Sequence, residues 1–316
     1  MKKVIVLLGP TGAGKTGASI LLAQELKTEI ISADSMQIYR GMDIGTAKPA
    51  KRELSLVKHH MIDIIGPTES YSAGQYIDSV TKIMEGLHKK GRIPIVVGGT
   101  GLYIKAMTRG LFSGPSADPG LRDELLSLEE NSAGSLYAYL AQLDAETAGN
   151  IQENDIRRIV RALEVCLKSR EKISLLRKRL TSPLPYEFIK IGLTRERKEL
   201  YRIIDERVEK MFWAGFMEEA ETILGKCPAR TAMQAIGYKE LAMYLNKEID
   251  KDEAVRLIRR NTRRYAKRQF TWFKKEEDII WVDVTGIFDS TGVFDSVRGA
   301  LLRVCPEIFS CDMGKR

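Results

Sequence analysis

Residues 9–16 carry the clearest chemical signal in this chain. They read Gly-Pro-Thr-Gly-Ala-Gly-Lys-Thr and follow an apolar run at 4–8. This spacing is that of G-x-x-x-x-G-K-[ST], in which backbone N–H groups surround phosphate oxygens, the lysine neutralises charge and the final hydroxyl ligates Mg²⁺. We therefore predict a phosphate loop with Thr16 as the magnesium ligand, made of Gly9, Pro10, Thr11, Gly12, Ala13, Gly14, Lys15 and Thr16.

Asp34 is a second candidate for chemistry, because it follows the short apolar run at 29–32. In an open α/β sheet the carboxyl ends of the strands face the ligand crevice, which would place Asp34 beside the phosphate loop. There it could accept a proton from an attacking nucleophile. Two other roles stay open on the residues alone: an N-cap for a following helix, or a magnesium ligand acting through water.

The apolar run at 93–97 ends in Gly98-Gly99-Thr100-Gly101. Glycines and a hydroxyl at this edge of a sheet suit a second close approach of backbone to a ligand, and a plain strand-to-helix turn is the alternative. The clear acidic strand end that ATPases use is hard to find. The motif alone therefore leaves open whose phosphate is bound.

The elements that position these residues alternate along the chain. Apolar runs that suit buried parallel strands are followed by helical patterns, which predicts an α/β fold with a P-loop NTPase-like parallel-sheet core. Between two proline-rich segments the strands vanish and helical spacing takes over, so we predict a discontinuous core, 1–115 and 186–316, with an all-helical insertion at 116–185. The expected strands lie at 4–8, 29–32, 61–65, 93–97, 189–193 and 279–282, and the expected helices include 16–26, 73–90 and 196–224.

Positive charge is concentrated in two segments of the 316-residue chain, whose net charge is +8. Nine basic and no acidic residues lie between 254 and 275, and without them the rest is close to neutral; a second group lies at 157–179. Such clusters indicate a polyanionic partner. The four cysteines form no CxxC, and no apolar run approaches the ~18 residues that a membrane helix needs, so we expect an intracellular, cytoplasmic protein without zinc or disulfides.

Several further segments, in this order, resemble bacterial tRNA dimethylallyltransferases, the family that isopentenylates tRNA. They include Gly-Met-Asp-Ile-Gly-Thr-Ala-Lys-Pro at 41–49, and the resemblance extends to about residue 283. An ordered set of this size is far more specific than the phosphate loop alone. The segments are 9–16, 31–39, 41–49, 97–103, 116–119, 154–164, 235–240 and 263–273.

The resemblance implies transfer of a dimethylallyl group from dimethylallyl diphosphate to the exocyclic amine of the adenosine 3′-adjacent to the anticodon. It implies Mg²⁺ as cofactor and a tRNA anticodon stem-loop as partner, and we expect a monomer. Asp34 would be the general base and Thr100 would bind near the reacting centre. Lys15, Thr16 and Arg207 would stabilise the departing diphosphate.

The target base must leave its stack to react, and the resemblance implies which residues receive it. Ser35 and Gln37 would read the adenine edge, with loop capping as the alternative. A cationic helix face (Arg256, Arg260, Arg263, Lys267) would bind phosphates, whereas Ile258, Tyr265 and Trp272 are expected in the core. The implied tRNA contacts are Asp34, Ser35, Met36, Gln37, Thr100, Arg122, Arg157, Arg158, Ile159, Val160, Arg161, Gln234, Ala235, Ile236, Gly237, Tyr238, Lys239, Arg263 and Lys267.

Two other functions compete with this interpretation. A small-molecule or nucleoside kinase would share the phosphate loop, a helical lid and an Asp34 base, but would not need the basic segment at 254–275. A nucleic-acid-binding ATPase switch would need a hydrolysis site beyond Asp34. The segment after residue 285 matches nothing in the resemblance, and its role is open at this point.

Overall fold

The computed structural model describes residues 1–112 and 114–309, which divide into two compact units. The larger unit comprises Met1–Thr108 together with the chain from Pro185 onward. The smaller unit is Arg109–Leu184. Each unit has a hydrophobic core of its own.

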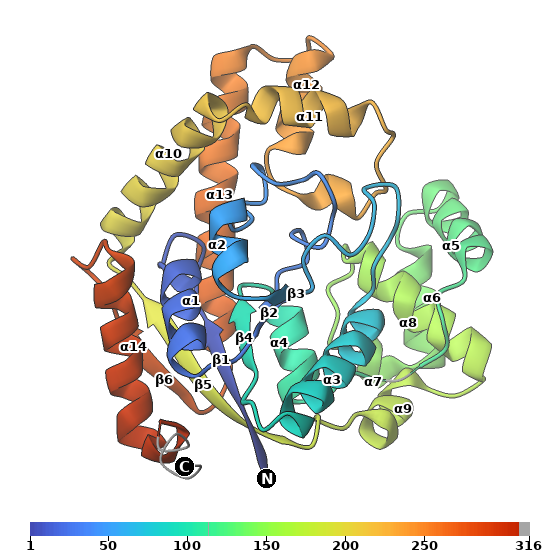
Figure 1. Cartoon of the computed structure of the whole chain (residues 1–316). Coiled ribbons are helices and arrows are strands. Elements are labelled where there is room, and N and C mark those ends of the chain that lie inside the picture. Colours follow the sequence, from blue (N-terminus) through green and yellow to red (C-terminus); the bar gives the residue numbers. More distant parts are fainter. Residues whose placement is uncertain (113, 310–316) are drawn as a thin grey trace. The chain divides into compact units, whose positions relative to one another are not determined.

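The larger unit is built on a six-stranded parallel sheet (Figure 1). In the order β3-β2-β4-β1-β5-β6 its strands are His59–His60, Ile30–Ala33, Ile95–Gly98, Lys2–Leu8, Tyr186–Thr194 and Ile279–Asp283. The register pairs Gly98 with both Ala33 and Leu8. Because every strand runs the same way, the phosphate loop, Asp34 and the glycine turn leave the sheet at one edge. The predicted α/β core is confirmed.

Helices α1 (Lys15–Glu25) and α14 (Ser290–Val304) bury one face of this sheet. Ile5 and Leu7 of β1 share a core cluster with Val293, Val297 and Leu301 of α14. The segment after residue 285, which the sequence left without a role, is therefore part of the core. Its described part also contains the short 3-10 helix η2 (Pro306–Ile308), whose Ile308 joins the same cluster.

Helices α3 (Ala73–Lys89) and α4 (Gly101–Thr108) follow β3 and β4 in the chain and pack together. The ring of Tyr76 in α3 stacks on that of Tyr103 in α4, with centroids 3.8 Å apart. The Tyr76 hydroxyl donates to the carbonyl of Ser32 at 3.2 Å, which fixes α3 to β2. This contact lies two residues before Asp34.

A helical layer lies beyond the carboxyl edge of the sheet (Figure 1). Its core joins α11 and α12 to the loop after β2 through Tyr39, Phe216 and Tyr238. Helix α13, the longest, carries the basic segment and runs from α12 toward the sheet (Figure 1). The helices are α2 (Lys51–Leu56), α10 (Arg197–Trp213), α11 (Phe216–Leu224), η1 (Ala232–Gln234), α12 (Tyr238–Leu245) and α13 (Lys251–Phe273).

The smaller unit contains helices and no strand among its described residues, as the helical insertion predicted. Ile159 and Leu163 of α8 are fully buried, which confirms the expected amphipathic helix. Buried Glu164 lies among them and accepts hydrogen bonds from Arg122, Arg161 and the backbone of Asp118. The helices are α5 (Pro119–Asn131), α6 (Ser135–Leu143), α7 (Ala145–Ala148), α8 (Ile156–Ser169) and α9 (Ile173–Leu180).

Two predictions of secondary structure from the sequence were wrong. The run at 61–65 is not a strand: Met61 and Asp63 have φ of 63° and 54°, which extended chains do not adopt, and Ile65 makes only an isolated bridge to Tyr39. The helix expected at 196–224 is two helices, because Gly215 has φ 95° and ends the first. Both departures bend the chain beside the carboxyl edge of the sheet.

None of the helices in the described part of the chain has the length and apolar character needed to cross a membrane.

We expect Val297→Ala to destabilise the protein far more than Val304→Ala. Both valines lie on α14, but Val297 is fully buried whereas Val304 is 50% exposed. Losing two buried methyl groups and leaving a cavity should cost about 2–3 kcal/mol, against less than about 0.5 kcal/mol at the surface. Urea unfolding followed by circular dichroism measures both; equal effects would mean that α14 is not part of the core.

Candidate active site

A cavity of about 870 Å³ opens at the carboxyl edge of the sheet, within the larger unit. It is lined by the phosphate loop, the turn after β2 and the glycines after β4, and by residues of α10 and α13. Segments far apart in the sequence thus surround one space. Of the predicted catalytic residues, Lys15, Asp34 and Arg207 line this cavity.

The phosphate loop curls between β1 and α1 as its sequence predicts. Gly9, Gly12 and Gly14 all have positive φ (147°, 85° and 91°), the region that side chains disfavour. A Cβ on Gly9 would also lie 2.8 Å from the carbonyl oxygen of Leu193 on the neighbouring strand. Backbone N–H groups and the start of α1 therefore converge on the cavity, which is the arrangement that binds phosphate.

Lys15 folds back onto its own loop, where its ammonium donates to the carbonyls of Gly9 at 2.9 Å and Pro10 at 2.8 Å. Burial lowers the pKa of Lys15 to about 8; the Asp34 carboxylate acts against this shift and the Arg207 guanidinium adds to it. The ammonium is thus poorly solvated and close to losing its proton near neutral pH. An anionic ligand would restore its preference for the charged form.

Arg207 reaches the same loop from α10. Its guanidinium donates to the Thr11 hydroxyl at 3.0 Å. Burial lowers the pKa of Arg207, while the nearby Asp34 carboxylate raises it. Arginine stays charged in proteins even so, so the cavity holds a fixed positive charge beside the phosphate loop.

Asp34 caps a turn and not a helix. Its Oδ1 accepts hydrogen bonds from the backbone N–H groups of Met36 at 2.8 Å and Gln37 at 3.4 Å, and the next helix begins only at Lys51. The N-cap interpretation is therefore wrong. Burial raises the pKa of Asp34 despite these two hydrogen bonds and despite Lys15 and Arg207. A carboxylate with a raised pKa is a better proton acceptor than an exposed one.

Thr100 sits beside this turn, outside the residues that line the cavity. Its hydroxyl accepts from the backbone N–H of Ser35 at 3.0 Å and lies 3.4 Å from the Ser35 hydroxyl. Its own N–H donates to the carbonyl of Ala33 at 3.0 Å. Thr100 therefore links the glycine turn to the segment that carries Asp34.

Gln37, the predicted reader of adenine, is engaged within the protein. Its Oε1 accepts from the Ser32 hydroxyl at 3.1 Å, and its Nε2 donates to the carbonyl of Ala47 at 3.4 Å. This is the loop-capping alternative left open by the sequence. Ser35, Met36 and Gln37 all line the cavity.

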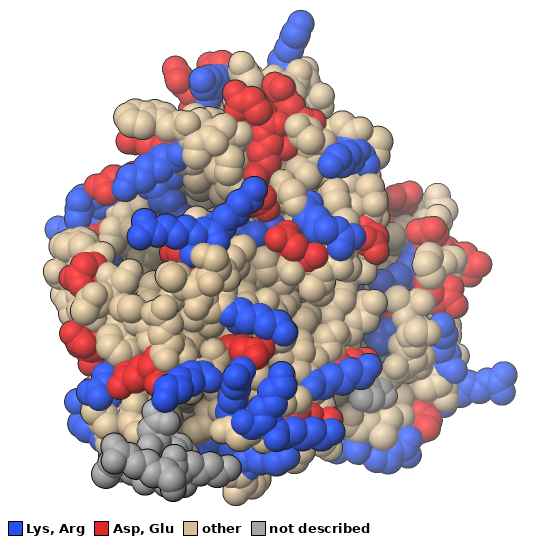
Figure 2. All heavy atoms as spheres, in the orientation of Figure 1, with Lys and Arg blue, Asp and Glu red and all other residues tan. Residues whose placement is uncertain are grey.

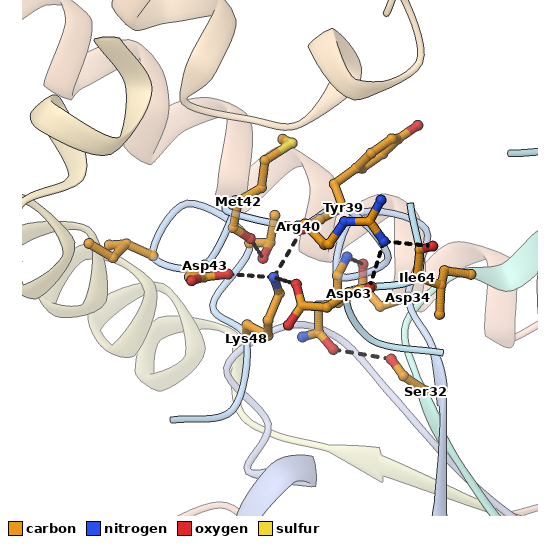
Figure 3. Close-up of polar contacts among 12 residues, drawn as sticks. Ser32, Asp34, Tyr39, Arg40, Met42, Asp43, Lys48, Asp63 and Ile64 are labelled. Carbon is orange, nitrogen blue, oxygen red and sulfur yellow. Dashed lines mark hydrogen bonds and ion pairs between the residues drawn. The ribbon is translucent and has the colours of Figure 1, made fainter. Parts of the chain in front are cut away.

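The segment 41–49 closes one side of the cavity, and Lys48 holds it (Figure 3). The Lys48 side chain is only 3% exposed, and its ammonium contacts the Asp43 and Asp63 carboxylates and the Tyr39 carbonyl. Two carboxylates compensate this buried charge. Lys48 therefore joins residues 39–43 to residue 63 through contacts of a single ammonium group.

Glu219 of α11 holds the same segment from the other side. One carboxylate oxygen accepts from the N–H groups of Asp43 at 2.9 Å and Ile44 at 2.8 Å. The other accepts from the N–H of Gly45 at 2.9 Å and the hydroxyl of Tyr238 at 2.6 Å. The role of Glu219 was not predicted from the sequence, because no residue near it in the chain indicates which backbone N–H groups it binds.

Some of the basic residues expected to form a cationic face on α13 are engaged in ion pairs within the protein. Arg263 donates to Asp205 at 2.9 Å and lies over the ring of Tyr201, and Arg256 pairs with Glu253. Lys267 is exposed and Arg268 lines the cavity. Figure 2 shows Lys and Arg side chains interspersed with Asp and Glu on the face it draws.

The apolar stripe expected on α13 is core only at Ile258, which is buried. Trp272 is half-buried and packs against Gly101, where a Cβ would come within 2.3 Å of the indole. Tyr265 instead lines the cavity, with its hydroxyl in hydrogen-bonding contact with the side chains of Thr100 and Gln269. A ring with a polar end explains this departure from the core.

The segment 234–239 meets the cavity at its start only. Gln234, Ala235 and Ile236 line it, and Lys239 is exposed to solvent. Tyr238 is fully buried against Phe216 and bound to Glu219, so its side chain positions the segment and does not face a ligand.

In the smaller unit the predicted tRNA contacts differ in exposure. Arg157 and Arg158 are exposed, while Arg122 and Arg161 are half-buried and held by Glu164. Ile159 and Val160 are buried in the core of this unit. Their side chains can position the neighbouring arginines but cannot touch RNA.

Among the described residues no group of three or more His, Cys, Asp or Glu side chains could hold a metal ion. Mg²⁺ does not need such a group, since it usually keeps several waters and binds substrate phosphates with one or two protein oxygens. Thr16, at the cavity wall beside Lys15, offers one such oxygen. These residues fit a magnesium ion that is held mainly by a bound diphosphate.

A family model described as IPP transferase matches residues 37–276, which excludes the phosphate loop and Asp34. A tRNA dimethylallyltransferase of Thermodesulfovibrio yellowstonii is 51% identical over 96% of this chain and 98% of its own length. One of Thermotoga maritima is 44% identical over 98% and 99%.

Solved structures agree with these sequence matches. The full-length tRNA isopentenylpyrophosphate transferase of Bacillus halodurans has a TM-score of 0.70 and 38% identity, covering 96% of this chain and 98% of that one. A eukaryotic dimethylallyltransferase acting on tRNA has a TM-score of 0.82 and 28% identity, covering 100% of this chain and 81% of that one.

We expect diphosphate affinity to fall as the pH rises through about 8, because Lys15 then loses its proton. Calorimetric titration of inorganic diphosphate from about pH 7 to pH 9 measures this. Lys15→Arg keeps its charge over this range and corrects for the ionisation of diphosphate itself. Parallel pH profiles for the two proteins would contradict the lowered pKa.

Proposed function

The chain belongs to the IPP transferase family, and we infer that it is a tRNA dimethylallyltransferase, a prenyltransferase that modifies tRNA. We propose that its donor is dimethylallyl diphosphate and its acceptor the exocyclic amine of the adenosine 3′-adjacent to the anticodon. The products are then isopentenyladenosine in tRNA and free diphosphate. The observation that carries this proposal is the meeting of Asp34, Lys15 and Arg207 in one cavity beside the phosphate loop.

In the proposed reaction the lone pair of the adenine amine attacks the first carbon of the prenyl chain. The bond from this carbon to the diphosphate oxygen breaks, and the diphosphate departs with the bonding electrons. Asp34 takes the proton that the amine loses, a role for which its raised pKa is suited. The loop N–H groups, Lys15 and Arg207 stabilise the negative charge that builds on the leaving oxygen.

Magnesium would further neutralise the leaving diphosphate, and Thr16 would hold it. Thr100 would act through the turn: by binding Ser35 it keeps the chain next to Asp34 in place. It would therefore position the base and the acceptor more than react with them.

The acceptor adenosine would enter past the turn 34–37 and the segment 234–239. Arg157 and Arg158 of the helical insertion and Lys267 of α13 are exposed cations that suit the phosphates of the anticodon arm. Arg122 and Arg161 would contribute only the guanidinium surface that Glu164 leaves exposed. We propose that the enzyme acts as a monomer, and that it works in the cytoplasm, where its tRNA substrate is found.

The direct test is a transfer assay without ATP. The protein, Mg²⁺, radiolabelled dimethylallyl diphosphate and unmodified bulk tRNA are incubated, and label in the tRNA is counted and mapped. We expect incorporation at the adenosine beside the anticodon. Folded protein that binds tRNA and incorporates no label would refute the proposal, and phosphoryl transfer from added ATP to a small acceptor would favour a kinase.

We expect Asp34→Asn to lower the single-turnover rate constant by about 10²–10⁴-fold, the usual contribution of a general base. The amide keeps the size of the carboxylate but cannot accept the proton. Affinity for tRNA should change little, and the exposed Asp78→Asn on α3 should behave like the unaltered enzyme. A parallel loss of tRNA affinity in Asp34→Asn would mean that Asp34 mainly shapes the binding surface.

A further inference from the structure

Gln269 lies in the C-terminal half of α13 and is buried with 6% of its surface exposed. Its Oε1 accepts a hydrogen bond from the backbone N–H of Thr11 at 2.9 Å. Its Nε2 donates to the carbonyl of Gly99 at 3.0 Å. One amide thus joins the phosphate loop to the glycine turn, two segments that leave neighbouring strands.

The surroundings of Gln269 fit this bridge closely. A Cβ on Gly99 would lie 2.1 Å from Nε2, so only glycine lets the amide approach this turn. Four residues earlier on α13, the Tyr265 hydroxyl contacts both Thr100 and Gln269. Trp272, three residues later, packs on Gly101. One face of α13 therefore docks along the whole glycine turn.

Both partners of Gln269 lead directly to groups that take part in the reaction. Thr11 also receives the hydrogen bond of Arg207, the cation next to the leaving group. Gly99 precedes Thr100, which binds Ser35 beside Asp34. In addition to the pairing of β1, β4 and β2, two hydrogen bonds from one side chain thus join the phosphate loop to the turn that leads to the base.

We propose that Gln269 is a positioning residue for the transfer reaction, which rests on the function proposed above. It holds the phosphate loop and the Thr100 turn in register, so that the leaving diphosphate, the prenyl carbon and the amine facing Asp34 fall in line. Displacement requires this alignment, and a misplacement of about 1 Å can cost on the order of 10²-fold in rate.

The chemistry of the side chain explains why an amide is needed. The bridge takes one acceptor and one donor, and glutamine supplies both at the same end. Glutamate would accept from Thr11 but repel the Gly99 carbonyl. Methionine has a similar length and can make neither hydrogen bond.

The test compares Gln269→Met and Gln269→Glu with Gln24→Met, a matched change at an exposed glutamine on α1. Single-turnover assays at saturating substrates give a rate constant and an amplitude. We expect the rate constant of Gln269→Met to fall by about 10–100-fold with the amplitude intact, Gln269→Glu to lie between, and Gln24→Met to match the unaltered enzyme. tRNA affinity should stay within about twofold in all three.

A reduced amplitude with an unchanged rate constant would overturn the proposal, because a merely structural residue lowers the fraction of folded enzyme. Amide hydrogen exchange supplies a readout that does not depend on transfer. The N–H of Thr11 should exchange faster in Gln269→Met than in Gln24→Met. Unchanged protection of Thr11 would overturn the bridge even if the enzyme transferred label, whereas absence of label in the unaltered protein would count only against the proposed function.

Discussion

The enclosure of three ionisable groups in one cavity is the constraint on which the site depends. Lys15, Arg207 and Asp34 each lose solvation there, and each shifts against its charged form. Asp34 attracts both cations. The Gly9 and Pro10 carbonyls hold Lys15, and two backbone N–H groups of the turn after β2 hold Asp34. Two half-buried cations face one carboxylate, so the cavity carries a net positive charge that suits an anionic ligand.

Loops at the carboxyl edge of a sheet expose backbone groups that water would otherwise satisfy. In this protein distant side chains take over that role. Glu219 binds three successive N–H groups of the segment 41–49, and Lys48 binds the carbonyl of Tyr39 just before this segment. Gln269 binds the phosphate loop and the glycine turn. Because buried backbone groups left without partners are costly, these three side chains stabilise the observed conformation of the loops around the cavity.

The parts of the site that could be predicted from the sequence are those encoded locally. The phosphate loop needs only its glycines, Lys15 and Thr16, and the position of Asp34 follows from the end of one strand in a parallel sheet. Glu219 and Gln269 could not be found in this way, since each serves backbone that lies more than a hundred residues away in the chain. The apolar run at 61–65 was wrongly predicted to be a strand for a related reason. Ile64 and Ile65 pack against the core around Tyr39, but positive φ values at Met61 and Asp63 prevent an extended strand.

The basic residues of the sequence show a similar limit, because residue type does not reveal which cations are free to bind a phosphate. Arg122, Arg161, Arg256 and Arg263 match a basic signal by residue type, yet each is held by a carboxylate from its own helix or a neighbouring one. Such pairing fixes where a guanidinium points but reduces what it can gain from a phosphate, since the carboxylate must share it. Helix α13 has two different faces: one carries cations toward solvent, while another places Tyr265 and Gln269 against the glycine turn and the phosphate loop. The inner contacts fix how α13 lies on these turns, and acidic neighbours fix where Arg256 and Arg263 point on its outer face.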